Sequence, residues 1–354
     1  MSYGGYPDLT FVRRILVIKM RHLGDVLLTT PLFSALQAAL PQAQIDGCVY
    51  SDCASVLQNH PAIRSLLCVD RCWKKLSLFQ RLRKELSLLR QIRSNHYDLV
   101  IQLTEGDRGA IMARVSGAPV RVGWSNSKKS SWFTHLAKSC PSLRHTVERN
   151  LDALRRIGIF PELEARELFF HVPANADKIQ IDGAIIIHPA SRWRFKCWPV
   201  PRMRALARRL LERGEKLIFI SGPDAEERRM VAEIIEGLDV LDLSGQLSLQ
   251  ELGALLKRSK ALICVDSMVL HLASALKVPV IALFGPTSEV TWGPWRNPNA
   301  RVVTANLSCR PCYQDGCGGS KRSDCLAAIS VDMVLENLSK LRMYSFQFNP
   351  LGCL

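Results

Sequence analysis

Arg14-Ile-Leu-Val-Ile-Lys-Met-Arg-His-Leu-Gly-Asp25 is the stretch of sequence that decides the fold. Its first part is an apolar run without alternation, which predicts a strand buried on both faces. A short loop ending at Gly24 and Asp25 follows, and then Leu32, Leu36 and Leu40 recur at helical spacing before Pro41. A buried strand, a loop and a helix in this order predict the first unit of an α/β protein with a parallel sheet.

The same alternation continues along the whole chain. Further strands are predicted at 45–50, 65–69, 99–103, 120–123 and 168–172, with a long helix over 76–92. The pattern restarts with strands at 184–188, 216–221, 240–243, 261–265 and 280–284, between helices at 201–213, 225–236, 249–258 and 270–276. We therefore expect two Rossmann-like domains, residues 1–175 and 176–330, joined through the polar stretch 173–182. A helix over 331–341, within a C-terminal segment 331–354, is expected to cross back over the joint.

Composition excludes several classes of protein. A hydrophobic share of 47% in 354 residues is enough for well-filled cores and excludes a disordered chain. No apolar run approaches the ~20 residues that a transmembrane helix needs, and the N-terminus lacks the apolar core of a secretory signal. We expect a cytoplasmic protein whose 12 cysteines are reduced.

The charge is strongly positive and concentrated in one segment. Lys and Arg number 47 against 32 Asp and Glu, a net charge of +15, and residues 64–93 contain nine basic and two acidic residues. The helix predicted there is either an ordinary helix that packs through a stripe of leucines and exposes its basic residues to solvent, or a helix whose basic face contacts a phosphorylated, anionic partner. Aromatic residues that could stack on bases are few, which argues against nucleic acid.

Four loops follow predicted strands at the edge where open α/β sheets bind ligands. In the first, Gly24 allows close approach, and Asp25 is either a functional carboxylate or a helix cap or first-turn acid. The second loop, residues 188–198, carries Arg and Lys side chains suited to binding a phosphate group, although it could also be a plain solvated basic loop. The third loop, residues 265–271, places backbone N–H groups at the start of a helix, where they could bind an anion. His271 follows within that helix and could equally have a structural role. The fourth is a glycine turn at Gly285.

Six short motifs occur in order along the chain. They are Ile-Lys-Met-Arg-His-Leu-Gly-Asp25, Phe-Lys-Cys-Trp198, Ser-Gly-Pro-Asp224, Val-Asp-Ser267 with His271, Leu-Phe-Gly-Pro-Thr287 and Trp-Gly-Pro-Trp295. Together they resemble the lipopolysaccharide heptosyltransferases of glycosyltransferase family 9, and within that family the heptosyltransferase III branch. The resemblance extends from about Arg13 to Leu341. A G-x-G-x-x-G fingerprint is absent after the first strand, which argues against a nicotinamide enzyme.

The resemblance implies a GT-B architecture, in which two Rossmann-like domains face each other across a cleft. It implies inverting transfer of L-glycero-D-manno-heptose from ADP-heptose to an inner-core heptose of lipopolysaccharide, with no metal ion and no other cofactor. The expected enzyme is cytoplasmic, in a Gram-negative cell, and contacts the inner face of the inner membrane. Its expected partners are the inner core and lipid A of lipopolysaccharide, and no nucleic acid partner is expected.

Site residues follow from the resemblance by position. Asp25 matches the family's proposed general base, and Lys196 matches the lysine that contacts the donor diphosphate. Asp266 matches the aspartate near the donor sugar. The other donor-binding residues are expected to be Ser191, Arg192, Gly222, Ser267, Met268, Val269 and His271, and the acceptor-binding residues Arg21, Arg81, Arg83 and Lys84. A base on the acceptor side and cations on the departing diphosphate are what inverting transfer requires.

Two alternatives remain open on the sequence. The same architecture could transfer another sugar from another nucleotide. A cluster of four cysteines, Cys309, Cys312, Cys317 and Cys325, has spacing close to that of a zinc site, so a metal- or nucleic-acid-binding protein is the alternative from a different class. Reduced thiols in a glycine-rich loop are the simpler interpretation of this cluster, and we expect no metal ion there.

Overall fold

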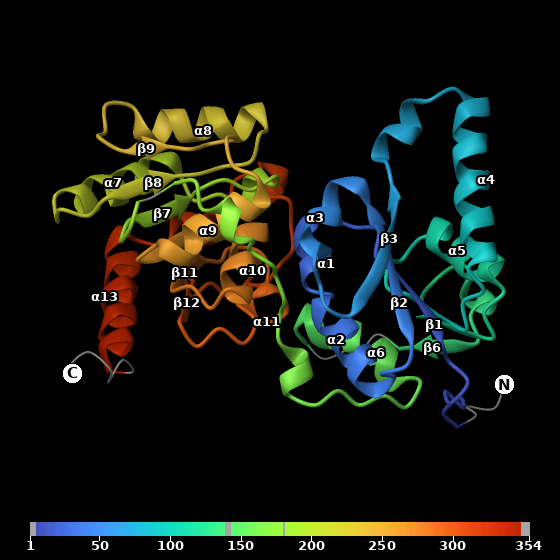
Figure 1. The fold of residues 1–354 in the computed structure, drawn as a ribbon. Coiled ribbons are helices and arrows are strands. Elements are labelled where there is room, and N and C mark those ends of the chain that lie inside the picture. Colours follow the sequence, from blue (N-terminus) through green and yellow to red (C-terminus); the bar gives the residue numbers. More distant parts are fainter. Residues whose placement is uncertain (1–4, 139–142, 180, 348–354) are drawn as a thin grey trace. The chain divides into compact units, whose positions relative to one another are not determined.

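The structure is a computed structural model that describes residues 5–138, 143–179 and 181–347, with side chains as far as residue 341. The chain divides into two compact units, Met1–His171 and Val172–Leu354. Each unit contains a six-stranded sheet in which all neighbouring strands are parallel (Figure 1). The expected tail after residue 347 lies outside the described residues.

The first unit begins with the strand predicted from the opening motif. Its strands are β1 (Arg14–Ile18), β2 (Gln44–Tyr50), β3 (Ile63–Val69), β4 (Leu99–Gln102), β5 (Val120–Trp124) and β6 (His135–Ala137). Its helices are α1 (Leu23–Leu27), α2 (Thr30–Ala39), α3 (Ala54–Leu57), α4 (Leu78–Ser94), α5 (Asp107–Ser116) and α6 (Thr146–Arg155). Strand β1 lies in the middle of the sheet and is almost wholly buried, as its unbroken apolar run predicts.

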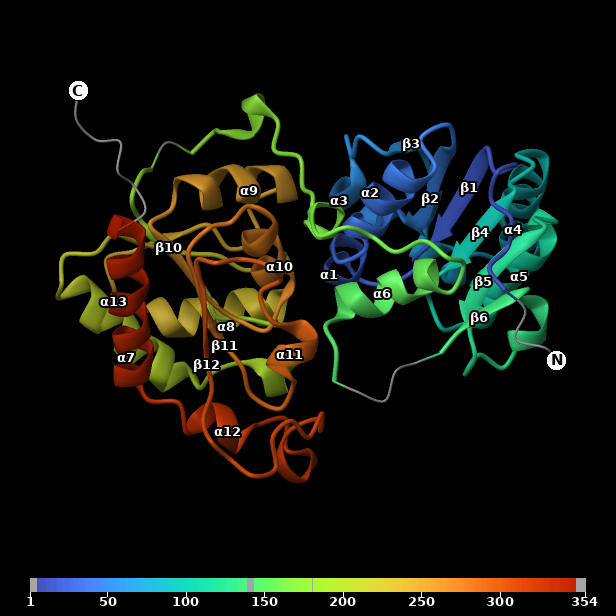
Figure 2. The same cartoon turned by 90° about the horizontal axis from the view of Figure 1, so that it is seen from below.

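The second unit has the same kind of sheet. Its strands are β7 (Ile185–His188), β8 (Leu217–Phe219), β9 (Leu241–Asp242), β10 (Ala261–Val265), β11 (Val280–Leu283) and β12 (Ala300–Val303). Its helices are α7 (Val200–Leu211), α8 (Ala225–Ile235), α9 (Leu249–Arg258), α10 (Met268–Ala275), α11 (Glu289–Trp292), α12 (Asp324–Ala327) and α13 (Val331–Gln347). Helices α7, α8 and α13 bury their apolar residues on one face of the sheet, and α9 and α10 cover the other (Figure 2).

The two sheets share one topology. The strand order is β3-β2-β1-β4-β5-β6 in the first unit and β12-β11-β10-β7-β8-β9 in the second. Numbered within its own unit, each sheet reads 3-2-1-4-5-6, the doubly wound order of dinucleotide-binding folds. The strand order reverses between β1 and β4 in one sheet and between β7 and β10 in the other. Ligands of such folds bind beyond the carboxyl ends of the two strands at this reversal, the switch point.

Parts of the sequence prediction are wrong. Residues 168–172 form no strand, and the backbone N–H of Phe169 donates to Thr30 Oγ1 at 3.0 Å instead of to a sheet neighbour. Helices α5 and α6 were not predicted. The edge strands β6 and β12 were missed as well, because their sequences, His-Leu-Ala and Ala-Arg-Val-Val, contain no unbroken apolar run of four residues. Helix α13 packs Val334, Leu335 and Leu338 into the core of the second unit, and its crossing back stays a prediction. No helix in the described part of the chain is long and apolar enough to cross a membrane.

Candidate functional site

The loop after β1 lies at the switch point of the first sheet and is fixed on both sides. The backbone N–H of Met20 donates to Thr104 Oγ1, just beyond β4, at 2.9 Å. The carbonyl oxygen of Arg21 accepts from Arg71 Nη2 at 2.7 Å and from Cys53 Sγ at 3.4 Å. The loop is therefore tied to segments from both neighbouring strands, and the start of α1 is held in place.

Asp25 is the third residue of α1 and is half-buried. The N-cap position belongs to His22, whose side chain makes no capping hydrogen bond, so the interpretation of Asp25 as a helix cap is wrong. A first-turn carboxylate still interacts favourably with the helix dipole. Within the described residues, the Asp25 carboxylate accepts no hydrogen bond and forms no ion pair, which leaves its oxygens available to a substrate.

Lys19 is a functional candidate that the sequence analysis missed. Its side chain is buried at the end of β1, and Nζ lies 3.3 Å from Asn150 Oδ1 and 3.5 Å from the carbonyl oxygen of Leu103. Burial lowers the pKa of Lys19 to about 8, although the nearby negative charge of Asp25 acts in the opposite direction. Lys19 therefore places a buried ammonium group near the Asp25 carboxylate.

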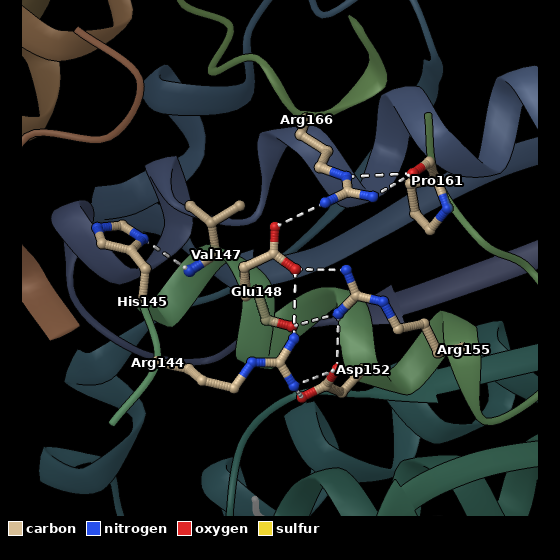
Figure 3. A network of polar contacts seen from close by, with 8 residues as sticks. All are labelled: Arg144, His145, Val147, Glu148, Asp152, Arg155, Pro161 and Arg166. Carbon is tan, nitrogen blue, oxygen red and sulfur yellow. Dashed lines mark hydrogen bonds and ion pairs between the residues drawn. The ribbon is translucent and has the colours of Figure 1, made fainter. Parts of the chain in front are cut away.

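Helix α6 supplies Asn150 and is anchored by a network of ion pairs (Figure 3). Asn150 also donates from Nδ2 to the carbonyl oxygen of Leu28 at 2.9 Å, which links α6 to the end of α1. Glu148 pairs with Arg155 and, at 3.2 Å, with Arg166. Although burial raises the pKa of Glu148, these guanidinium groups hold it below its usual value. The network fixes the helix on which the Lys19 contact depends.

Three loops of the second unit meet at its switch point. Lys196, from the loop after β7, forms an ion pair of 2.7 Å between Nζ and Asp266 Oδ2, directly after β10. Thr287, from the loop after β11, donates from Oγ1 to the same carboxylate oxygen at 2.7 Å. Asp266 is buried and Lys196 is half-buried. The carboxylate therefore holds the lysine in place, and the Lys196 side chain is 17% exposed.

Helix α10 begins beside this ion pair. Ser267 is its N-cap residue but makes no capping bond, and its Oγ shares a hydrogen bond of 3.2 Å with His188 Nδ1 at the end of β7. Burial lowers the pKa of His188 to about 4, so the ring is neutral near pH 7. Ser267 and Met268 are half-buried. The first backbone N–H groups of a helix have no partner within the helix, so this end can bind an anion next to Lys196.

Other predicted donor residues have surroundings or partners of their own. His271 is buried within α10, with its ring centroid 6.5 Å from that of Trp292. The backbone N–H of Gly222 is already used, because it donates to Glu227 Oε2 at 2.9 Å. Ser191 Oγ accepts from the backbone N–H of Trp193 at 3.4 Å, and Arg192 is exposed. The structure therefore brings together Lys196, Asp266 and the start of α10 more closely than it does these residues.

The predicted acceptor-binding residues are exposed on two elements of the first unit. Arg21 lies in the loop after β1, and Arg81, Arg83 and Lys84 lie in the first half of α4. The prediction that the helix packs through a leucine stripe is wrong for this half. Leu78 and Leu82 are exposed, and the buried residues of the helix are Leu88 and Ile92. The charged residues therefore share their surface with apolar side chains.

The cysteine cluster forms no metal centre among the described residues, where no group of three or more His, Cys, Asp or Glu side chains could hold a metal ion. Cys309 and Cys317 are exposed, whereas Cys325 is buried at the start of α12. Cys317 Sγ accepts a hydrogen bond of 3.4 Å from the backbone N–H of Asp324. This hydrogen bond fits a loop that is held together by its own polar groups.

Comparison with known proteins gives a consistent result. The family model described as glycosyltransferase family 9 (heptosyltransferase) matches residues 85–321. A protein named lipopolysaccharide heptosyltransferase 3 from Escherichia coli is 34% identical over 307 residues, which are 82% of this chain and 88% of the relative. Lipopolysaccharide heptosyltransferase 1 of Pseudomonas aeruginosa is 29% identical over 86% of this chain and 87% of its own length.

Solved structures agree with the fold. A glycosyl transferase family 9 protein from Veillonella parvula superposes with a TM-score of 0.81, 23% identity and coverage of 97% of this chain and 100% of that one. The ADP-heptose heptosyltransferase II of E. coli gives a TM-score of 0.76 at 22% identity, with coverage of 94% and 99%. These likenesses confirm the predicted α/β fold of the GT-B type, with two Rossmann-like parallel sheets.

Proposed function

Because the chain belongs to glycosyltransferase family 9, the heptosyltransferases, we propose that it transfers heptose from ADP-heptose to lipopolysaccharide in the biosynthesis of the core oligosaccharide. The observation that carries this proposal is the 34% identity with lipopolysaccharide heptosyltransferase 3 over 82% of the chain. A related E. coli enzyme has been solved with ADP at a TM-score of 0.74, which supports an adenine nucleotide as donor. In the finer form of the proposal, the donor sugar is L-glycero-D-manno-heptose and the acceptor is an inner-core heptose.

The second unit is proposed to bind the donor. Lys196 and the backbone N–H groups at the start of α10 bind the diphosphate, because they place a cation and a helix N-terminus at one switch point. Asp266 holds Lys196 and lies near the donor sugar. The remaining donor contacts are Ser191, Arg192, Gly222, Ser267, Met268, Val269 and His271, with Met268 and Val269 acting through their backbone.

The first unit is proposed to supply the base. An acceptor hydroxyl oxygen attacks the anomeric carbon of the heptose and its proton passes to an Asp25 oxygen, while the bond from that carbon to the ADP oxygen breaks. The attack comes from the side opposite the leaving group, so the configuration inverts. Lys196 and the α10 N–H groups stabilise the charge that develops on ADP. This division needs no metal ion.

The acceptor is proposed to contact the basic side chains Arg21, Arg81, Arg83 and Lys84, which are exposed on one unit. Lipopolysaccharide carries phosphate groups with which these side chains can pair, and the enzyme is proposed to meet it at the cytoplasmic face of the inner membrane. Changing Arg81, Arg83 and Lys84 to Gln is expected to weaken acceptor binding, and the wild-type affinity is expected to fall as salt rises. An affinity measured by titration that does not depend on salt would contradict this assignment.

Product analysis with defined substrates tests the proposed function. The purified enzyme is incubated with ADP-heptose, UDP-sugars or GDP-sugars and with lipopolysaccharides truncated at successive core sugars, and products are identified by mass spectrometry. We expect addition of one heptose from ADP-heptose alone, to an acceptor that already carries an inner-core heptose. Transfer of another sugar, or no transfer to any truncated core, would overturn the proposal.

A further inference from the structure

Helix α4 and the turn before it expose apolar side chains that we call the α4 ridge, formed by Leu76 just before the helix and by Leu78, Phe79, Leu82 and Leu86 within it. Leu78 is 82% exposed, Phe79 76% and Leu82 53%. Leu78, Leu82 and Leu86 are spaced four residues apart, so they lie one above the other on the helix surface. Scattered apolar residues are normal on a protein surface, but a contiguous group indicates an interaction site.

The ridge is exposed because only the second half of α4 packs on the sheet. Leu88 and Ile92 are buried in the core of the first unit, and Leu89 is partly buried against it. Glu85 forms an ion pair of 2.7 Å with Arg108 on α5. Before Glu85, every residue from Lys74 to Lys84 is exposed. In Figure 1 this end of α4 and the chain that leads into it stand at the edge of their unit.

Basic side chains surround the ridge. Residues 71–84 contain six basic residues and no acidic one. On the helix surface, Arg83 and Arg90 lie along one side of the leucine row, and Arg81 and Lys84 lie beyond its other side. An apolar strip flanked by Lys and Arg is typical of helices that lie in the interface of an anionic bilayer.

We propose that the α4 ridge inserts into the boundary between headgroups and acyl chains of an anionic bilayer and docks the enzyme there, whether or not the acceptor is present. The surrounding Lys and Arg side chains contact lipid phosphates, while Leu78, Phe79 and Leu82 enter the apolar region. The inference rests on the proposed function only in one respect, because the proposed acceptor is a lipid and is therefore located in a membrane. It differs from acceptor recognition because apolar burial contributes to binding.

A second copy of the chain is a less suitable occupant of this surface. Pairing two α4 ridges would place two segments of six basic and no acidic residues against each other. Such like-charge contact opposes association, whereas the same charges favour an anionic membrane. Charge complementarity therefore selects the bilayer.

Vesicle sedimentation with the full-length protein tests the proposal. The vesicles contain phosphatidylcholine alone or phosphatidylcholine with phosphatidylglycerol, and no lipopolysaccharide. We expect binding to the anionic vesicles and a loss of about tenfold or more in partition coefficient for the double variant Leu78→Ser/Leu82→Ser. Binding of the wild type at high salt is expected to weaken but to remain above that of the variant, because apolar insertion is not screened.

A matched double variant separates insertion from a general loss of apolar surface. Leu143 and Leu163, in the same unit, are 53% and 54% exposed. Leu143→Ser/Leu163→Ser is expected to bind vesicles like the wild type, and thermal melting checks that both variants fold. Equal vesicle binding by Leu78→Ser/Leu82→Ser and the wild type would overturn the proposal. So would a wild-type protein that does not bind anionic vesicles, or a wild-type dimer that these two changes dissociate.

Transfer to a deacylated, water-soluble core acceptor distinguishes this inference from the proposed function. Leu78→Ser/Leu82→Ser is expected to keep that activity, because neither side chain belongs to the proposed catalytic machinery. Vesicle binding without transfer would refute the heptosyltransferase proposal alone. Transfer without vesicle binding would refute membrane docking alone.

Discussion

The two switch points have the same topology but treat their carboxylates in opposite ways. Asp25, beyond β1, forms no hydrogen bond or ion pair in the described part of the chain, while Asp266, beyond β10, receives both Lys196 and Thr287 on one oxygen at 2.7 Å each. The lysines differ in the same sense. Among the described residues, the hydrogen-bond partners of Lys19 are the neutral oxygens of Asn150 and Leu103, whereas Lys196 is paired with a carboxylate.

This difference shows that topology decides where a carboxylate lies and that its partners decide what it can do. A carboxylate that already accepts an ammonium group and a hydroxyl is poorly suited to take up a proton. It can instead fix the position of the cation that a departing diphosphate needs. A carboxylate whose oxygens accept no hydrogen bond from the described residues can instead accept a proton from a substrate hydroxyl.

The largest effect is expected from Asp25→Asn. The amide keeps the size of the side chain but cannot accept the acceptor's proton, so turnover is expected to fall by at least about 100-fold. Steady-state assays with saturating ADP-heptose measure it. Asp107→Asn is the control, because Asp107 is an exposed first-turn acid of α5 in the same unit. Turnover of the Asp25 variant above about one tenth of wild type would contradict the base assignment, since such groups contribute ~10²-fold or more.

The next effect concerns the buried charge of Lys19. Its pKa of about 8 lies below the ordinary 10.5, so between these values the unfolded chain binds a proton that the folded chain does not. Stability must therefore rise with pH in this window, by roughly 2 kcal/mol from pH 8 to 9.5 at 1.36 kcal/mol per pH unit. Unfolding by urea as a function of pH, compared between wild type and Lys19→Met, isolates this contribution. Parallel curves for the two proteins would show that Lys19 has an ordinary pKa.

A smaller effect, about tenfold in kcat/KM for ADP-heptose, is expected from Lys196→Ala, as for a lost charge-assisted contact to phosphate. Lys260→Ala is a matched control from the same sheet. Lys260 pairs with Glu215 at 2.8 Å, but it precedes β10 and so lies at the opposite edge. It is expected to leave transfer within about twofold of wild type. Similar losses in both variants would indicate an unspecific effect of charge.

Sequence reasoning placed the loops of the site but not the contacts within them. The strands before Lys196 and Asp266 are short apolar runs with strong local patterns, so the loops that follow could be located. Their ion pair joins residues 70 positions apart, and no local pattern reports such a distance. Thr287 and Lys19 both belong to the quoted motifs, and for Lys19 a charged residue directly after a buried strand was the available signal. Asn150 gave none.

The errors have a common physical cause. Residues 168–172 are apolar enough for a strand, yet the backbone of Phe169 bonds to a threonine side chain rather than to a sheet. The leucine row of α4 has helical spacing, yet Leu78, Leu82 and Leu86 are exposed in the part of the chain that the structure describes. In both segments the pattern reports what a residue could bury, while the tertiary structure decides whether a partner is present.

Calorimetric titration of ADP against Asp25→Asn and Lys196→Ala tests the division of roles most directly, because binding separates donor contacts from proton transfer. We expect Asp25→Asn to bind ADP within about twofold of wild type and Lys196→Ala to bind it about tenfold more weakly. Equal losses of ADP affinity in the two variants, or a loss confined to Asp25→Asn, would contradict this division of roles.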